Sequence, residues 1–195
     1  RIWEFIDLDE RVNFPLYYPV EGDVMSSPDR RPLYNVLING IKEGKITEVY
    51  DSSYFTTKKT LKEIESSLFT VDTTDVGLEQ MNEDLDAYRN GTKKIDEEYI
   101  RKTEIEAYNV HAYRIVGYWY FDKRQGELKY RLLGICPVVP DVFSLKNNDA
   151  ELEYVDLFWV YFPSPRDILH EAKAFNNRNS AMPFSFDHLL NARRF

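Results

Sequence analysis

The stretch AYRIVGYWYFDKRQGELKYRLLGICP, residues 112–137, carries the pattern that decides the fold. Its side chains alternate in character on both sides of residues 122–126, whose composition favours a turn. This alternation predicts an antiparallel hairpin with two distinct faces. One face carries Tyr113, Ile115, Trp119 and Phe121, and the opposite face carries Arg114, Val116, Tyr118 and Tyr120. We expect Trp119 to lie in the core, because the other members of its face are also large and apolar.

Helical patterns precede the hairpin. Residues 33–43 repeat apolar side chains at helical spacing, and Gly44 follows at the position of a left-handed cap. Residues 60–68 begin with Thr60 and Glu63, the pair that forms a capping box. A surface helix ending near residues 90–91 is predicted from the shared face of Leu78, Met81, Leu85 and Tyr88.

Several shorter segments are predicted from weaker patterns. Residues 1–8 suit either a helix face or a strand, and we expect a short helix there. Residues 96–102 are expected to add a turn of helix. Residues 46–50 are predicted to form a strand, and residues 154–162 a strand with both faces covered by other structure.

Two more helices are predicted near the carboxyl end. Ser164 as N-cap and Pro165 in the first turn start the first of them. Its apolar face is predicted to consist of Ile168, Ala172 and Phe175. The second is predicted to begin near Ser185.

Length and composition predict one folded domain over residues 1–195. The chain is 43% hydrophobic and 15% aromatic, which argues against disorder over most of its length. Its elements predict the α+β class: a mainly antiparallel sheet, from hairpin 112–137 and strand 154–162, packed against several helices. The net charge of -8 argues against general binding of nucleic acid, which requires clustered positive charge.

The sequence lacks the common motifs of catalysis and metal binding. The sequence contains no nucleophile elbow, no zinc-protease helix motif and no glycine-rich phosphate loop. The three histidines are far apart in sequence, and the single cysteine, Cys136, is expected to be a buried packing residue. We therefore expect no catalytic residue, no metal and no cofactor.

The chain has no apolar run near the length of about 20 residues that a membrane helix needs. It begins at Arg1 without a charged and then apolar export signal. We interpret it as a mature or trimmed segment that does not itself span a membrane.

The order of motifs resembles the GldN/PorN family, the periplasmic subunit of the type IX secretion and gliding machinery of Bacteroidetes. The resemblance spans nearly the whole chain and is weakest over residues 51–106. Gly117 and Tyr118 depart from it, since more acidic residues are usual there. The residues that carry it are Trp3, Tyr17, Tyr18, Pro19, Trp119, Phe121, Asp122, Gly134, Trp159, Pro163, Phe175, Asn176, Arg178, Asn179 and Phe186.

The resemblance implies a non-enzymatic structural subunit in the periplasm, peripherally associated with the outer membrane. Family members join an outer-membrane lipoprotein similar to GldK/PorK in hetero-oligomeric rings, which are coupled to an inner-membrane motor subunit similar to GldM/PorM. They also carry an export signal and extend beyond both ends of this sequence. A different function stays open: a stand-alone periplasmic module that binds glycan or peptidoglycan through its aromatic residues.

A partner-binding surface is predicted near the carboxyl end. Interfaces are enriched in arginine and in aromatic anchors. The candidates are Arg166, Arg178, Arg194 and Phe195. The competing explanation for the arginines is ordinary charge placement at helix ends.

Overall fold

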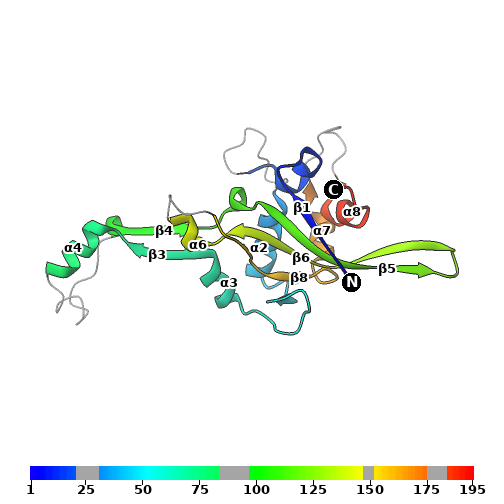
Figure 1. The fold of residues 1–195 in the computed structure, drawn as a ribbon, viewed down its shortest axis with the longest axis horizontal. Helices are drawn as coiled ribbons and strands as arrows, with labels where there is room; N and C mark the ends of the chain where they lie inside the picture. Colours follow the sequence, from blue (N-terminus) through cyan, green and yellow to red (C-terminus); the bar gives the residue numbers. More distant parts are fainter. Residues whose placement is uncertain (21–30, 84–96, 147–151, 175–183) are drawn as a thin grey trace.

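The computed structural model describes residues 1–20, 31–83, 97–146, 152–174 and 184–195 (Figure 1). Its centre is an antiparallel six-stranded sheet, which confirms the predicted class. Five strands are neighbours in the order β1 (Ile2–Asp7), β5 (Ala112–Asp122), β6 (Glu127–Pro140), β8 (Trp159–Tyr161) and β2 (Val49–Tyr50). The sixth strand, β7 (Tyr154–Asp156), also pairs with β6.

The predicted hairpin is confirmed, because β5 and β6 pair from Ala112 to Asp122. Its turn is closed by Asp122, whose Oδ1 accepts a hydrogen bond from Arg124 N at 3.0 Å, and Gly126 has a φ of 69°. The register shifts between Val116 and Gly117, which marks a β-bulge.

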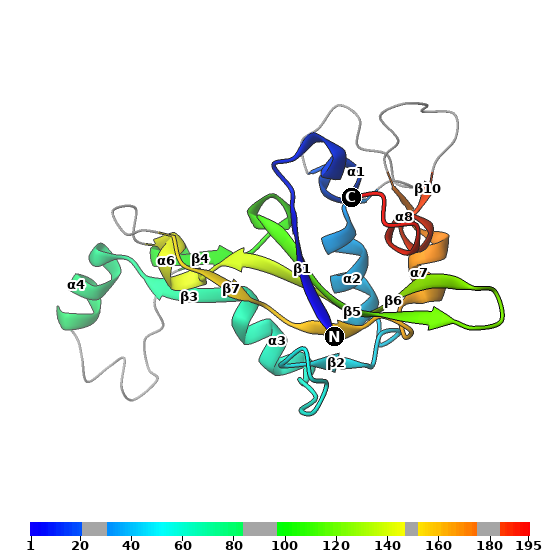
Figure 2. The same cartoon turned by 45° about the vertical axis from the view of Figure 1, so that its right-hand side comes forward.

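Helices cover one face of the sheet and form the main core with it. They are α1 (Phe14–Tyr17), α2 (Leu33–Lys42), α7 (Arg166–Glu171) and α8 (Phe186–Asn191) (Figure 2). The most buried contributors include Leu37, Ile115, Leu169 and Phe186. Gly44 follows α2 with a φ of 71°, as predicted for its cap.

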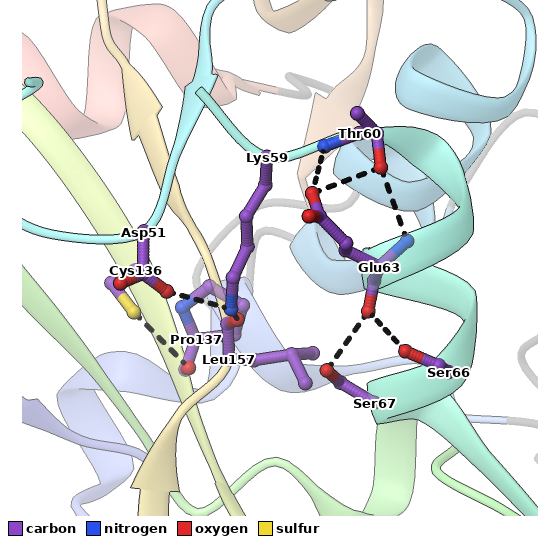
Figure 3. A network of polar contacts seen from close by, with 9 residues as sticks. All are labelled: Asp51, Lys59, Thr60, Glu63, Ser66, Ser67, Cys136, Pro137 and Leu157. Carbon is purple, nitrogen blue, oxygen red and sulfur yellow. Dashed lines mark hydrogen bonds and ion pairs between the residues drawn. The ribbon is translucent and has the colours of Figure 1, made fainter. Parts of the chain in front are cut away.

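The opposite face carries a second, smaller cluster of Tyr50, Val116, Cys136 and Trp159. Trp159 and Val160 are both buried and belong to different clusters, so strand β8 is covered on both faces as predicted. Lys59 stabilises the loop over this side, because its Nζ lies 3.1 Å from Asp51 Oδ1 and donates to Leu157 O at 3.0 Å (Figure 3).

Helix α3 (Leu61–Leu68) begins with the predicted capping box. Glu63 N donates to Thr60 Oγ1 at 3.4 Å, and Thr60 N donates to Glu63 Oε2 at 2.6 Å (Figure 3). The chain then leaves the body of the molecule as an arm, which we define as β3 (Phe69–Thr73), α4 (Asp75–Glu83), η2 (Glu97–Tyr99) and β4 (Ile100–Glu104). Strands β3 and β4 form a separate two-stranded sheet.

Shorter elements complete the described residues. They are η1 (Arg11–Asn13), η3 (Ala107–Asn109), α6 (Val142–Lys146), β9 (Lys173–Ala174) and β10 (Phe184–Ser185). Ser185 caps α8 by accepting a hydrogen bond from His188 N, which confirms the predicted start of the last helix.

The helix predicted over residues 1–8 is wrong, because these residues form strand β1. Ile2, Phe5 and Ile6 are the apolar residues that suit a helix face here. Of the three only Ile6 is buried, and it lies opposite Tyr113 of β5. Pairing with the open edge of β5 therefore determines the structure here, and a local pattern cannot reveal such a partner.

Other predicted boundaries were partly correct. Strand β2 covers only the last two residues of 46–50. Of the turn of helix predicted at 96–102, the described residues 97–102 form η2 and then part of β4. The strand predicted at 154–162 is divided into β7 and β8. Helix α7 uses Pro165 as its N-cap and ends at Glu171, before Phe175. Phe175 and the predicted end of the surface helix, residues 85–91, lie outside the described residues.

The prediction that Trp119 lies in the core is also wrong, since 42% of this residue is exposed. Its face was predicted correctly: Trp119 is opposite Tyr130, which packs against the main core. However, β1 pairs with β5 only as far as Gly117, so the hairpin projects beyond the sheet from residue 118 onward. Alternation identifies a common face but cannot indicate where its cover ends.

Candidate functional site

Three of the four predicted partner-binding residues lie on or beside α7 and α8. Arg166 at the start of α7 forms a two-pronged ion pair with Asp187 of α8, with distances of 2.9 Å from Nε to Oδ1 and 3.2 Å from Nη2 to Oδ2. Arg194 is exposed, and its guanidinium lies 5.2 Å from the ring centre of Phe184. Arg166 thus joins two helices, whereas Arg194 lies at the surface.

The remaining predicted residues have different positions. Phe195 is half-buried and packs against the main core. Arg178 lies outside the described residues. The structure therefore brings Arg166, Arg194 and Phe195 to the carboxyl-terminal region around α8.

Arg193 connects more elements than any of the predicted candidates that the structure describes. Its guanidinium forms a two-pronged ion pair with Glu4 of β1, with distances of 2.6 and 2.9 Å. The same group lies 4.2 Å from the ring centre of Tyr130 and 5.3 Å from that of Trp119. It also lies 5.5 Å from the ring centre of Phe195. Arg193 thus links the first strand, the hairpin and the end of the chain.

Sequence reasoning missed Arg193 because its neighbour Arg194 has the same side chain in the same context. The backbone distinguishes them, since Arg193 has a φ of 50°, which is uncommon for a residue other than glycine. This conformation follows helix α8. A residue in that conformation marks a helix end, but asparagine, which stands two positions earlier as Asn191, adopts it more often than arginine does.

Tyr130, whose ring lies beside the Arg193 guanidinium, has a raised pKa. Burial, and then the nearby Glu4 carboxylate, raise the pKa of Tyr130 to about 12. Burial also raises the pKa of Tyr113 far above its usual value, and it raises that of Tyr34, whose hydroxyl donates to Ile105 O at 3.1 Å. The folded protein therefore holds these three phenols in their neutral form.

We expect the free energy of unfolding to fall as the pH rises from about 10 to 12. A free tyrosine titrates near pH 10, so the unfolded chain loses these protons before the folded one does. The contribution of the three neutral phenols to the free energy of unfolding is therefore fully present below pH 10. Replacing Tyr130 by phenylalanine should reduce the alkaline loss, measured by urea unfolding at several pH values. Equal losses in Tyr130→Phe and the parent protein would contradict the assignment.

Two aspartates and a histidine lie close together beside the end of β1. Asp7, Asp9 and His111 bring possible metal-binding atoms within 4.8 Å of one another. His111 Nδ1 lies 4.0 Å from Asp9 Oδ2, a long ion-pair distance, and Asp9 is largely exposed. This arrangement is typical of a surface ion pair.

Cys136 is buried, as expected from the sequence. Its thiol donates to Pro137 O at 3.4 Å (Figure 3), and burial raises its pKa well above the usual value. A neutral, enclosed thiol is a poor nucleophile, so the observed environment is that of a packing residue.

Exposed aromatic side chains gather on β1 and on the projecting part of the hairpin. They are Trp3, Phe5, Trp119, Tyr120 and Phe121. Tyr118 and Tyr120 are neighbours on one face, but their ring planes are inclined by 50°. The rings therefore do not form a flat row, and Arg193 lies beside the aromatic residues of the other face.

A family model described as gliding motility associated protein GldN matches residues 1–195. The chain belongs to the GldN family. No curated protein matches this GldN-family chain in a direct sequence comparison. Among the helices that the structure describes, none combines the length and apolar character required to cross a membrane.

Proposed function

We propose that this GldN-family protein is a non-enzymatic structural subunit of a periplasmic ring complex in the type IX secretion system. In this role it associates peripherally with the outer membrane through a lipoprotein similar to GldK/PorK. It also contacts a motor subunit similar to GldM/PorM. The family match over the whole chain is the observation that carries this proposal. The exposed aromatic residues near Arg193 support it, because interfaces combine such anchors with arginine.

The carboxyl-terminal surface is the proposed contact with the lipoprotein. It comprises Arg166, Arg178, Arg194 and Phe195. Arg194 is exposed beside Phe184, and Phe195 is partly accessible next to Arg193. Arg166 contributes through Asp187, because their ion pair holds α7 against α8 and so fixes the surface that both helices form.

Replacing Arg166, Arg178 and Arg194 together by glutamate should weaken capture of the full periplasmic protein by the lipoprotein at least tenfold. Reversing charges that face a complementary partner introduces repulsion in place of attraction. Capture can be measured as equilibrium binding to immobilised lipoprotein. Undiminished capture would remove this surface from consideration.

The triple substitution requires a control for folding, since Arg166 also pairs with Asp187. A variant with only Arg178→Glu and Arg194→Glu preserves that pair. Thermal unfolding of both variants separates loss of the surface from loss of α7 packing. Secretion and gliding should fail in cells that carry either binding-deficient variant.

Glycan binding is a second candidate function, favoured by the exposure of Trp119 and Tyr120. Aromatic side chains at a surface can stack on sugar rings. Purified peptidoglycan fragments should then bind the protein and change its tryptophan fluorescence, and Trp119→Ala should abolish the change. The absence of binding to these fragments would exclude this candidate.

A further inference from the structure

The molecule carries a thin two-stranded projection at each end of its long axis (Figures 1 and 2). One is the arm defined above. The other is the hairpin tip, which we define as residues 118–131 of β5, β6 and their turn. Both views place the arm and the tip at opposite ends, with the main core between them. One chain therefore cannot bring its own two projections together.

The hairpin tip exposes apolar side chains because none of the other described strands flanks it. Strand β1 begins its pairing with β5 at Gly117, and β8 pairs with β6 only at Gly134 and Ile135. Within the tip, Trp119, Phe121 and Leu128 share one face, and the last two are 60% and 63% exposed. Clustered apolar exposure of this kind is typical of an interaction surface.

The arm exposes apolar side chains for a similar reason. Among the strands that the structure describes, β3 and β4 pair only with each other, and a sheet of two strands cannot enclose its own side chains. Phe69 and Val71 lie two residues apart on one face of β3 and are 45% and 52% exposed. Val76 and Leu78 of α4 are exposed as well.

The two projections carry opposite charges. Basic residues predominate in the tip. One of its two acidic residues, Asp122, forms an ion pair with Lys129, with 3.2 Å from Nζ to Oδ2. The tip contains Lys123, Arg124, Lys129 and Arg131 against Asp122 and Glu127. The sequence of the arm, over residues 69–83 and 97–104, contains Asp72, Asp75, Glu79, Glu83, Glu97, Glu98 and Glu104 against Arg101 and Lys102. The tip is therefore positive within a chain of net charge -8, and the arm is strongly negative.

We propose that the hairpin tip of one copy of this chain docks on the arm of the next copy. Apolar side chains on both projections supply surface to bury, and the opposite charges favour tip against arm over tip against tip or arm against arm. The partner is thus a second copy of the same chain. This contact is a deeper form of the proposed assembly role and rests on it.

A contact between different ends of identical copies is heterologous and can be repeated. Each copy that docks its tip still presents a free arm, so the interaction produces a ring if the rotation between copies closes. If the rotation does not close, it produces a filament. The arm, formed by β3, α4, η2 and β4, then has a clear role as the acceptor of the neighbouring tip.

Charge reversal tests the contact directly on the full chain. The tip variant carries Lys123→Glu and Arg124→Glu, and the arm variant carries Glu79→Lys, Glu98→Lys and Glu104→Lys, so that the net charge of each projection changes sign. Wild-type protein should self-associate in sedimentation experiments as its concentration rises, and less strongly at 1 M salt than at 0.1 M, where screening is weaker. Each variant alone should associate about 100-fold more weakly, because like charges then face each other.

Mixing the two variants provides the decisive measurement. In an equimolar mixture every tip can meet an arm of opposite charge, so association should return to the wild-type level. A matched control carries Arg11→Glu and Lys42→Glu. It changes the net charge by the same amount as the tip variant, but on the body of the molecule, away from both projections. It should associate like wild-type protein. Failure of the mixture to recover, or equal weakening in the control, would overturn the proposal.

Engineered cysteines test the geometry independently. Phe121→Cys and Val76→Cys in one chain cannot form an intrachain disulfide, since they lie on opposite projections. The native Cys136 is buried and does not compete. Mild oxidation should produce a ladder of disulfide-linked oligomers, whereas each single-cysteine variant should give dimers at most. Absence of the ladder would contradict the docking of tip on arm.

Measuring capture by the lipoprotein distinguishes a failure of the contact between copies from a failure of the proposed function. The tip variant should lose self-association and keep its capture by the lipoprotein. If wild-type protein is not captured but the double-cysteine variant still forms the ladder, the proposed partner is wrong and the contact between copies stands. If capture is intact and wild-type protein stays monomeric at all concentrations, the contact between copies is wrong and the proposed partner stands.

Discussion

Replacing Phe186 by alanine should lower the free energy of unfolding by about 3–5 kcal/mol, the usual cost of deleting a large aromatic side chain from a core. Phe186 begins α8 and has no exposed surface. Its removal leaves a cavity between α8 and the remainder of the main core, which includes Leu169 of α7. The loss can be measured by urea denaturation, with an unchanged dependence on urea concentration as evidence that the unfolded state is the same.

Trp119→Ala is the matched comparison, because it deletes a side chain at least as large. This residue is half exposed, and its ring contacts Tyr130 and Arg193 at the edge of the core. We expect a loss of about 1 kcal/mol, mainly from the ring contacts. Equal losses in Phe186→Ala and Trp119→Ala would show that the tip is covered in solution, for example by another copy.

Local chemistry allowed much of the fold to be predicted. The capping box of Thr60 and Glu63, the cap at Gly44 and the turn that begins at Asp122 were all correct. Each depends on hydrogen bonds or backbone angles within a few residues, which the sequence displays directly. The two faces of the hairpin were correct for the same reason.

The errors concern contacts between distant parts of the chain. Strand β1 exists because residues 2–7 meet β5 more than 100 positions away, and no local pattern encodes that meeting. Trp119 was assigned to the core because its face continues from Ile115, which is buried. Strand β1 flanks β5 only as far as Gly117, so residues beyond that point have no neighbouring described strand on this side. Where β1 stops flanking β5 depends on how the whole sheet is assembled.

At the candidate site too, local sequence predicted the region, whereas the contacts between distant residues could not be predicted. The partner surface near the carboxyl end stays a prediction, and the structure places Arg166, Arg194 and Phe195 around α8. The individual contacts of these residues depended on folding. Arg166 is engaged by Asp187, and Arg193 rather than Arg194 meets both Glu4 and Tyr130. Adjacent arginines are equivalent in sequence, and the positive φ of Arg193 directs their side chains to different surroundings.

Replacing Arg193 by glutamine should lower the free energy of unfolding by about 2–3 kcal/mol. Hydrogen bonds to charged groups contribute more than neutral ones, and the loss of the guanidinium leaves Glu4, which is about three-quarters buried, without its partner. Contacts with Tyr130 and Trp119 add a smaller amount. Urea denaturation of the variant measures the change.

Three further variants determine whether the contacts of Arg193 cause this effect. Arg194→Gln removes the same charge one residue later and should cost less than about 1 kcal/mol, since that side chain is exposed and its guanidinium lies beside the ring of Phe184. Arg193→Lys keeps the charge but cannot bind both oxygens of Glu4, so its loss should be intermediate. In a double-mutant cycle, Glu4→Gln should cost little once Arg193 is glutamine. Additive losses in that cycle would mean that Glu4 and Arg193 do not stabilise each other, and that the end of the chain is held against β1 by packing alone.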